Sequence, residues 1–177
     1  MSQATLFPNA TGATLSACER YRYALWRDWD VHLGRVCWIM LNPSTADAEK
    51  DDPTIRRCMG FARDWGYGGI VVVNLFGFRA TRPADLLHVD DSVGPENDST
   101  IAEVLDSTMT RIVVCAWGQN APLDREECVL GILSNYSVTP NALRLTKAGA
   151  PSHPLYLPKE LVPAPFVART PPEPEGA

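Results

Sequence analysis

The alternation of apolar and polar positions divides the chain into short buried segments that are separated by polar loops. Residues 36–41 form an apolar run, and residues 70–73 and 112–116 form two more. Apolar, β-branched runs of about four to eight residues with polar turns at both ends are typical of strands buried on both faces. We therefore predict three central strands at these ranges and a short fourth strand at residues 142–145.

Between the first two strands, the apolar residues recur at helical spacing. They are Ile55, Cys58, Met59 and Ala62. Asp52 is a good N-cap for this helix, and Pro53 fits its first position. The pattern predicts a helix that runs to about Trp65, where glycines follow.

Two further helices complete an alternation of strands and helices. Asn97 or Asp98 can cap a helix that carries Ile101 and Val104, and Pro122 opens another that runs to about Ser134. Strand–helix–strand units imply parallel pairing with right-handed crossovers. We predict an α/β domain with three layers, in which a mainly parallel, four-stranded central sheet lies between helices.

The ends of the chain follow other patterns. Residues 21–29 alternate aromatic or apolar residues with charged ones, so we expect a half-buried strand that forms a hairpin with residues 36–41. Residues 1–17 lack periodicity and are expected to form a flexible arm. Residues 158–177 are rich in proline and glutamate and are expected to be extended or disordered. The single α/β domain then spans residues 18–157.

Composition narrows the functional classes. The 177 residues are 45% hydrophobic and 21% charged, as in a globular domain, and no apolar run has membrane-spanning length. The N-terminus does not resemble a signal peptide, so we expect a cytoplasmic protein without membrane contact. The net charge of −5 argues against a surface that coats nucleic acid broadly, but it allows a small basic patch around one cleft.

Cofactor and metal signals are weak. Neither a GxGxxG nor a P-loop pattern is present, the five cysteines include no CxxC pair, and the three histidines are scattered. We therefore expect no cofactor and no metal.

Polar residues follow the end of each predicted strand. Asn42, Pro43, Ser44 and Thr45 follow the first strand, Asn74 the second, Trp117 and Gly118 the third, and His153 a loop after the fourth. Because the carboxyl ends of parallel strands meet at one edge of a sheet, we expect these groups to converge on a ligand site. Each group also has a plain structural alternative, namely a turn, a strand-end cap or an exposed loop histidine.

Other side chains near these loops are candidates for ligand contact. Phe76 and Phe78 can stack on a planar ligand, although packing in the core is the commoner role of phenylalanine. Arg79 and Arg82 can contact phosphate. Asp47 lies close to the first loop and is the candidate carboxylate for acid–base work.

The segment MLNPSTADAEKDDPTIRRCMGFARDWGYGGIVVVNLFGFRATRP resembles the signature of a bacterial and phage family, the domain of unknown function 1643. The segments GPEND, VVCAWG and SHPLYLP extend the resemblance to about residues 18–157. The family name implies no activity.

The order of the motifs is also similar, more distantly, to the uracil-DNA glycosylase superfamily. In those enzymes a Gly-x-Asp/Asn-Pro loop follows the first strand, an asparagine ends a later strand, and a His-Pro-Ser-Pro loop comes late. Leu41-Asn42-Pro43, Val73-Asn74 and His153-Pro154-Leu155 resemble these motifs in turn. The resemblance implies their fold, with a four-stranded parallel sheet between helices.

The same resemblance implies roles for individual residues. Asn42 would position the attacking water, Asn74 would bind the edge of a flipped pyrimidine, and His153 would stabilise charge on the departing base. Leu155 or Tyr156 would fill the gap that the flipped base leaves. Met40 stands where those enzymes have glycine, and Leu155-Tyr156 replaces the second half of the His-Pro-Ser-Pro motif.

The leading expectation is therefore an enzyme that hydrolyses the N-glycosidic bond of a pyrimidine in DNA, modified pyrimidines included. Two alternatives stay open. One is a module that binds a nucleotide or nucleic acid without breaking a bond, and the other is a hydrolase or transferase that acts on free nucleotides. The partner in each case is DNA or a nucleotide, and the sequence leaves the oligomeric state open.

Overall fold

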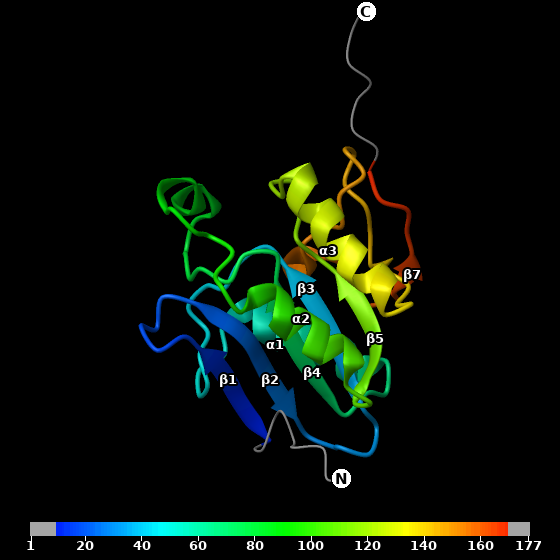
Figure 1. Ribbon diagram of the computed structural model, residues 1–177. Helices are drawn as coiled ribbons and strands as arrows, with labels where there is room; N and C mark the ends of the chain where they lie inside the picture. Colours follow the sequence, from blue (N-terminus) through cyan, green and yellow to red (C-terminus); the bar gives the residue numbers. More distant parts are fainter. Residues whose placement is uncertain (1–9, 170–177) are drawn as a thin grey trace, which may run out of the picture.

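The computed structural model describes residues 10–169, and it is an α/β fold built on one mixed sheet (Figure 1). Within that range the sheet has seven strands in the order β1-β2-β4-β3-β5-β6-β7. The strands are β1 (Thr11–Leu15), β2 (Arg22–Asp28), β3 (Arg35–Met40), β4 (Gly69–Asn74), β5 (Thr110–Cys115), β6 (Asn141–Ala142) and β7 (Ala164–Pro165). The α/β class expected from the sequence is confirmed.

The centre of the sheet is parallel. β3 pairs in parallel with β4 on one side and with β5 on the other, and β5 pairs in parallel with β6. The predicted strands at residues 36–41, 70–73 and 112–116 are all present. The fourth is shorter and earlier than predicted, because the chain leaves the sheet after Ala142 and Leu145 instead bridges to Pro151.

β2 differs from its sequence prediction. It pairs antiparallel with β1 and β4, so β4 separates it from β3 and no hairpin with β3 forms. It is also buried on both faces rather than half-buried. The reason is that its charged residues point inward: Arg22 and Arg27 are only 3% and 4% exposed, and both donate hydrogen bonds to the loop after β3.

Both terminal segments contribute strands to the sheet. β1 lies within the segment expected as a flexible arm, and its pairing with β2 supplies the order that its own sequence pattern lacks. β7 lies within the expected C-terminal tail and pairs antiparallel with β6. Residues 1–9 and 170–177, which belong to the same two predictions, lie outside the described residues.

Apolar clusters cover both faces of the sheet. α1 (Pro53–Asp64) packs on one face, where Ile55 and Phe61 meet Trp38 of β3. α2 (Asn97–Asp106) and α3 (Leu123–Asn135) pack on the other, where Ile101 and Val129 join a separate cluster. Figure 1 shows α2 and α3 on the near side of the strands. Alternate residues of β3 and β4 therefore enter different cores, which explains their continuous apolar runs.

The start of α1 follows its prediction. Asp52 is the N-cap, its carboxylate accepts a hydrogen bond of 2.9 Å from the Ile55 N–H, and Pro53 occupies the first turn.

Two short 3₁₀ helices, η1 (Pro83–His88) and η2 (Pro154–Tyr156), lie in loops. Among residues 10–169, no helix has the length and apolar character needed to cross a membrane.

Candidate functional site

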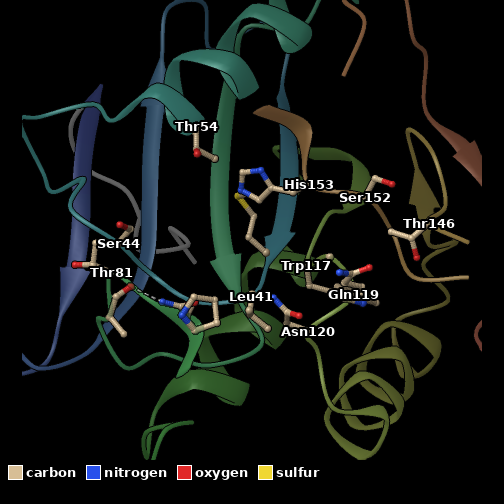
Figure 2. Close-up of a pocket in the computed structure, with 15 residues that line it drawn as sticks. Leu41, Ser44, Thr54, Thr81, Trp117, Gln119, Asn120, Thr146, Ser152 and His153 are labelled. Atoms are coloured by element: carbon tan, nitrogen blue, oxygen red, sulfur yellow. Dashed lines mark hydrogen bonds between the residues drawn. The ribbon is translucent and has the colours of Figure 1, made fainter. Parts of the chain in front are cut away.

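A cavity of about 500 Å³ lies where the loops after β3, β4 and β5 meet (Figure 2). Its lining residues are Met40, Leu41, Asn42, Ser44, Thr54, Ala80, Thr81, Pro83, Trp117, Gly118, Gln119, Asn120, Thr146, Ser152 and His153. In Figure 2, Ser44 and Thr81 stand on one side, Thr146 and Ser152 on the other, and His153 between them. The cavity therefore lies at the carboxyl ends of the parallel strands, where ligands bind in α/β folds.

Asn42 lines the cavity and also connects two loops. Its Nδ2 donates hydrogen bonds of 2.7 Å to the Ala80 carbonyl and 3.0 Å to the Pro43 carbonyl. Pro43 is buried, and its carbonyl also accepts from the Ala80 N–H at 2.9 Å. Both amide donors of Asn42 are thus used within the protein, which leaves Oδ1 as the group that can accept a hydrogen bond from a ligand or water.

Two buried arginines of β2 hold the rest of that loop against the sheet. Arg27 donates from Nη2 to the Asp47 carbonyl at 2.6 Å and from Nε to the Asp51 carboxylate at 2.8 Å. Arg22 donates from Nη1 to the Ala46 carbonyl, while its buried Nε has no partner among the described residues. Desolvation lowers the pKa of Arg22 from 12.5 to about 10, and the charge of Asp52 acts in the opposite direction.

No sequence pattern indicates this role for the arginines, because a charged residue in an alternating strand predicts a solvent-facing position. The bulge in the pairing of β1 with β2, between Thr14 and Leu15, changes that alternation near Arg22.

Asp47 forms a turn instead of facing the cavity. Its Oδ1 accepts hydrogen bonds from the N–H groups of Glu49 at 2.9 Å and Lys50 at 2.8 Å. These two bonds are the main reason that its pKa lies below the ordinary value. Asp47 and the exposed Thr45 are both absent from the cavity lining, so neither occupies the position that the sequence suggested for it.

His153 stands at the rim of the cavity, immediately before η2. Its Nδ1 accepts a hydrogen bond of 3.4 Å from the Leu155 N–H, an arrangement in which the neutral ring carries its proton on Nε2. Desolvation lowers the pKa of His153 below 6.5, and the charge of Asp52 partly opposes this effect. Leu155 is half-buried and Tyr156 is 92% exposed, and neither lines the cavity.

Asn74 ends β4 beside Met40 of β3, but its side chain is not part of the cavity lining. The residue is 1% exposed, and its Nδ2 has no partner among the described residues. Its carbonyl accepts a hydrogen bond of 2.9 Å from Nδ2 of Asn97, the first residue of α2. The expected convergence of Asn42, Asn74 and His153 is therefore found for Asn42 and His153 only.

Phe76 and Arg79 also lie outside the lining. Phe76 is 9% exposed and belongs to the core cluster under α2 and α3, which is the structural alternative that the sequence left open. Phe78 packs edge-on against Tyr21, with ring centroids 5.8 Å apart. Arg79 donates a hydrogen bond to the Glu19 carbonyl at 3.3 Å. Its positive charge lowers the pKa of both Arg22 and Asp47.

Trp117 and Gly118 line the cavity as expected from their place after β5. Trp117 is 2% exposed, and its Nε1 donates a hydrogen bond of 2.6 Å to Oε1 of Glu126 in α3. Gly118 has a φ of +78° and donates from its N–H to the Pro151 carbonyl at 2.8 Å. That bond joins the loop after β5 to the segment that carries His153.

The rest of the polar lining consists of hydroxyls and amides. It comes from Ser44, Thr54, Thr81, Gln119, Asn120, Thr146 and Ser152. Gln119 and Asn120 follow a predicted strand end and could have been proposed from the sequence on that ground. Thr54 comes from the first turn of α1, whereas Thr81, Thr146 and Ser152 come from loops whose approach no sequence pattern indicates.

The lining is electrically neutral apart from one titratable side chain. Among the described residues that line the cavity there is no Lys, Arg, Asp or Glu, and His153 is the one that titrates near neutral pH. Within residues 10–169, no three His, Cys, Asp or Glu side chains are grouped in a way that could hold a metal ion. The site can therefore offer many neutral hydrogen bonds and one imidazole to a ligand.

The chain was compared with family models, curated proteins and solved structures. No curated protein and no solved structure matches the chain. The family model described as "Protein of unknown function (DUF1643)" matches residues 22–155, a range that includes all of the lining residues and both arginines of β2. The chain therefore belongs to the DUF1643 family.

Proposed function

We propose that the protein is an N-glycosyl hydrolase related to the uracil-DNA glycosylases, which removes a pyrimidine, normal or modified, from DNA. The observation that carries the proposal is that Asn42 and His153, which come from opposite ends of the domain sequence, line one cavity. A parallel arrangement of β4, β3, β5 and β6 with helices on both faces of the sheet also supports it. A base must leave the stack to enter such a cavity.

In this proposal Asn42 binds the attacking water on one side of the glycosidic bond, and His153 contacts the departing base on the other. The free Oδ1 of Asn42 would accept a hydrogen bond from the attacking water and hold it near the sugar carbon. The Nε2–H of neutral His153 would donate to the base as negative charge develops on it. Preorganised donors of this kind stabilise a developing charge strongly, because they need no reorganisation during the reaction.

Recognition of the base would differ from the pattern that the sequence suggested. Asn74 lies outside the cavity lining, whereas the amides of Gln119 and Asn120 belong to it. A side-chain amide presents a donor and an acceptor together, which suits the edge of a pyrimidine. We assign the reading of the base edge to these two residues in place of Asn74.

The neutral lining favours a nucleoside unit over a phosphate inside the cavity. A bound phosphate normally takes Arg, Lys or a helix N-terminus as its partner. The lining has neither Arg nor Lys, and the N-terminus of α1, which contributes Thr54, is already capped by the Asp52 carboxylate. In this proposal the sugar and base enter the cavity, while the phosphates stay outside, near Arg79 and the exposed Arg82.

The decisive assay uses single-stranded and duplex oligonucleotides that carry uracil or modified pyrimidines, followed by alkaline cleavage at abasic sites. Cleavage is expected on at least one substrate, with loss of most activity in Asn42→Ala and in His153→Ala. Asn135→Ala, an exposed residue at the end of α3, is the matched control. No abasic sites on any substrate, or equal cleavage by Asn42→Ala and Asn135→Ala, would refute the proposal.

A non-catalytic binding module is the second candidate, favoured by the turn-forming role of Asp47, which leaves no carboxylate in the lining. This alternative predicts saturable binding of a pyrimidine nucleoside with no product. Calorimetric titration with a uracil-containing oligonucleotide, with the released base measured in the same samples, separates the two candidates.

A further inference from the structure

Residues 164–169, near the C-terminus, pack against residues that line the cavity or adjoin its lining. β7 pairs with β6 through residues 164 and 165, and the next residue, Phe166, meets Trp117 edge-on with ring centroids 6.3 Å apart. The segment lies beyond residues 22–155, the range that the family model matches. The segment thus lies outside the matched range, and it contacts Trp117, which lines the cavity.

Arg169 is the main contact of this segment. Its Nε donates to Oε2 of Glu126 at 3.1 Å, and its Nη2 forms an ion pair with Oε1 of the same carboxylate. Nη2 also donates to the Ala121 carbonyl at 3.1 Å. The stem packs on Gly149, since a Cβ at that position would lie 3.2 Å from Cγ of Arg169. One side chain thus contacts three separate segments.

Each residue that Arg169 contacts is bonded to, adjacent to or in the same turn as a residue that lines the cavity. Glu126 holds the indole N–H of Trp117, and Ala121 directly follows Asn120. Gly149 belongs to the turn that Thr146 begins, in which the Thr146 N–H donates to the Ala150 carbonyl at 2.8 Å. Trp117, Asn120 and Thr146 all line the cavity.

We propose that Arg169 is a positioning residue, which fixes the indole of Trp117 in the cavity wall by holding the carboxylate of Glu126. The Glu126 side chain is 3% exposed, and a buried carboxylate without a cationic partner carries a large desolvation penalty. Without Arg169 the carboxylate would turn outward or draw in water, and the Trp117 N–H would lose its acceptor. This inference concerns the cavity wall and holds whichever ligand the cavity takes.

The test follows the indole N–H of Trp117 by proton–nitrogen NMR, with the resonance assigned by its loss in Trp117→Phe. In the wild type this proton should exchange slowly with solvent, because it is bonded to a buried carboxylate. Arg169→Met should accelerate its exchange by about tenfold or more, as expected for loss of about 1.4 kcal/mol of local protection. Arg63→Met, an exposed arginine of α1 that stacks on Trp29, is the control.

A double-mutant cycle separates positioning through Glu126 from a general loss of stability. Glu126→Gln keeps an oxygen acceptor for Trp117 but removes the charge that Arg169 pairs with. If Arg169 acts through Glu126, the double variant should exchange no faster than the faster single variant. Arg169→Lys, which keeps the charge but not the planar fork, should give an intermediate rate and serves if Arg169→Met does not fold. An exchange rate in Arg169→Met equal to that of Arg63→Met, or fully additive effects in the cycle, would overturn the proposal.

Discussion

The side-chain amide of Asn42 donates a hydrogen bond of 2.7 Å to the carbonyl of Ala80, which joins the loop after β3 to the loop after β4. The Ala80 N–H returns a hydrogen bond of 2.9 Å to the Pro43 carbonyl. The two loops therefore form one wall of the cavity. Asn42 joins these loops and also lines the cavity, where it is the residue proposed to hold the attacking water. A loss of activity on changing Asn42 must be interpreted together with its effect on stability.

Replacement of Asn42 should destabilise the fold measurably. Asn42→Ala leaves the Ala80 carbonyl short of a donor and should lower the free energy of unfolding by about 1–2 kcal/mol. Asn42→Asp should cost at least as much, since it keeps the shape but turns an oxygen toward the same carbonyls. Urea denaturation checks both values. Ser44→Ala, in the same loop but outside the hydrogen bonds that join Asn42 and Pro43 to Ala80, should stay within about 0.5 kcal/mol of wild type.

The two buried arginines of β2 should respond differently to replacement by methionine. Arg27 satisfies its guanidinium through several carbonyls and the Asp51 carboxylate, so Arg27→Met removes many bonds and leaves Asp51 unpaired. We expect a loss of about 3 kcal/mol. Arg22 keeps a buried Nε without a partner among the described residues, so Arg22→Met also relieves a desolvation penalty and should cost less than about 1 kcal/mol.

Guanidinium denaturation gives both values, and hydrogen exchange over residues 43–52 shows whether the loop is released. The expected result is faster exchange in Arg27→Met alone. Equal destabilisation by the two variants would mean that burial, and not the hydrogen bonds to the loop, determines what these arginines contribute.

The sequence predicted those parts of the fold that depend on local chemistry. Three buried strands and the Asp52-Pro53 start of α1 follow from apolar runs and capping rules, and they are present in the structure. Neighbour relations in the sheet do not follow from local pattern. The insertion of β4 between β2 and β3, and the pairing of β7 with β6, depend on contacts between segments far apart in the chain.

The same distinction applies to the candidate site. Asn42, Trp117 and His153 line the cavity because strand ends converge, which the alternation of strands and helices predicts. Asn74 and Phe76 also follow a strand end, but the direction of each side chain depends on how the chain turns after β4. The sequence predicts a place for Asp47 in the site, but its carboxylate accepts hydrogen bonds within a turn instead. From the sequence alone, an aspartate that forms such a turn cannot be distinguished from a catalytic one.

Gly118 provides a test of backbone geometry at the cavity. Its φ of +78° is unfavourable for any residue with a Cβ, although a Cβ there would meet no atom within 4 Å. Gly118→Ala should therefore cost about 1 kcal/mol through backbone strain alone, without a steric clash. Thermal unfolding checks this value. Gly131→Ala in α3, also in open space but at a φ that is not positive, is the matched control and should be neutral or slightly stabilising.

The charge state of His153 gives the predicted pH dependence. Because desolvation lowers its pKa below 6.5, the ring is neutral in the folded protein at pH 7, while the unfolded chain binds the proton near pH 6.5. The stability that this difference contributes is therefore present above pH 6.5 and is lost as the pH falls through the folded pKa. Activity that needs the neutral ring should decline over the same acidic range.

An NMR titration of the His153 ring, assigned with His153→Gln, should give a midpoint below 6.5. Asp52→Asn provides the sharper test, because asparagine caps a helix about as well as aspartate while the charge is removed. Since the Asp52 carboxylate raises the pKa of His153, its loss should move the midpoint still lower, with α1 intact by circular dichroism. A midpoint at or above 6.5 in the wild type would show that desolvation does not dominate the pKa of His153, and an upward shift in Asp52→Asn would show that the Asp52 charge does not raise that pKa.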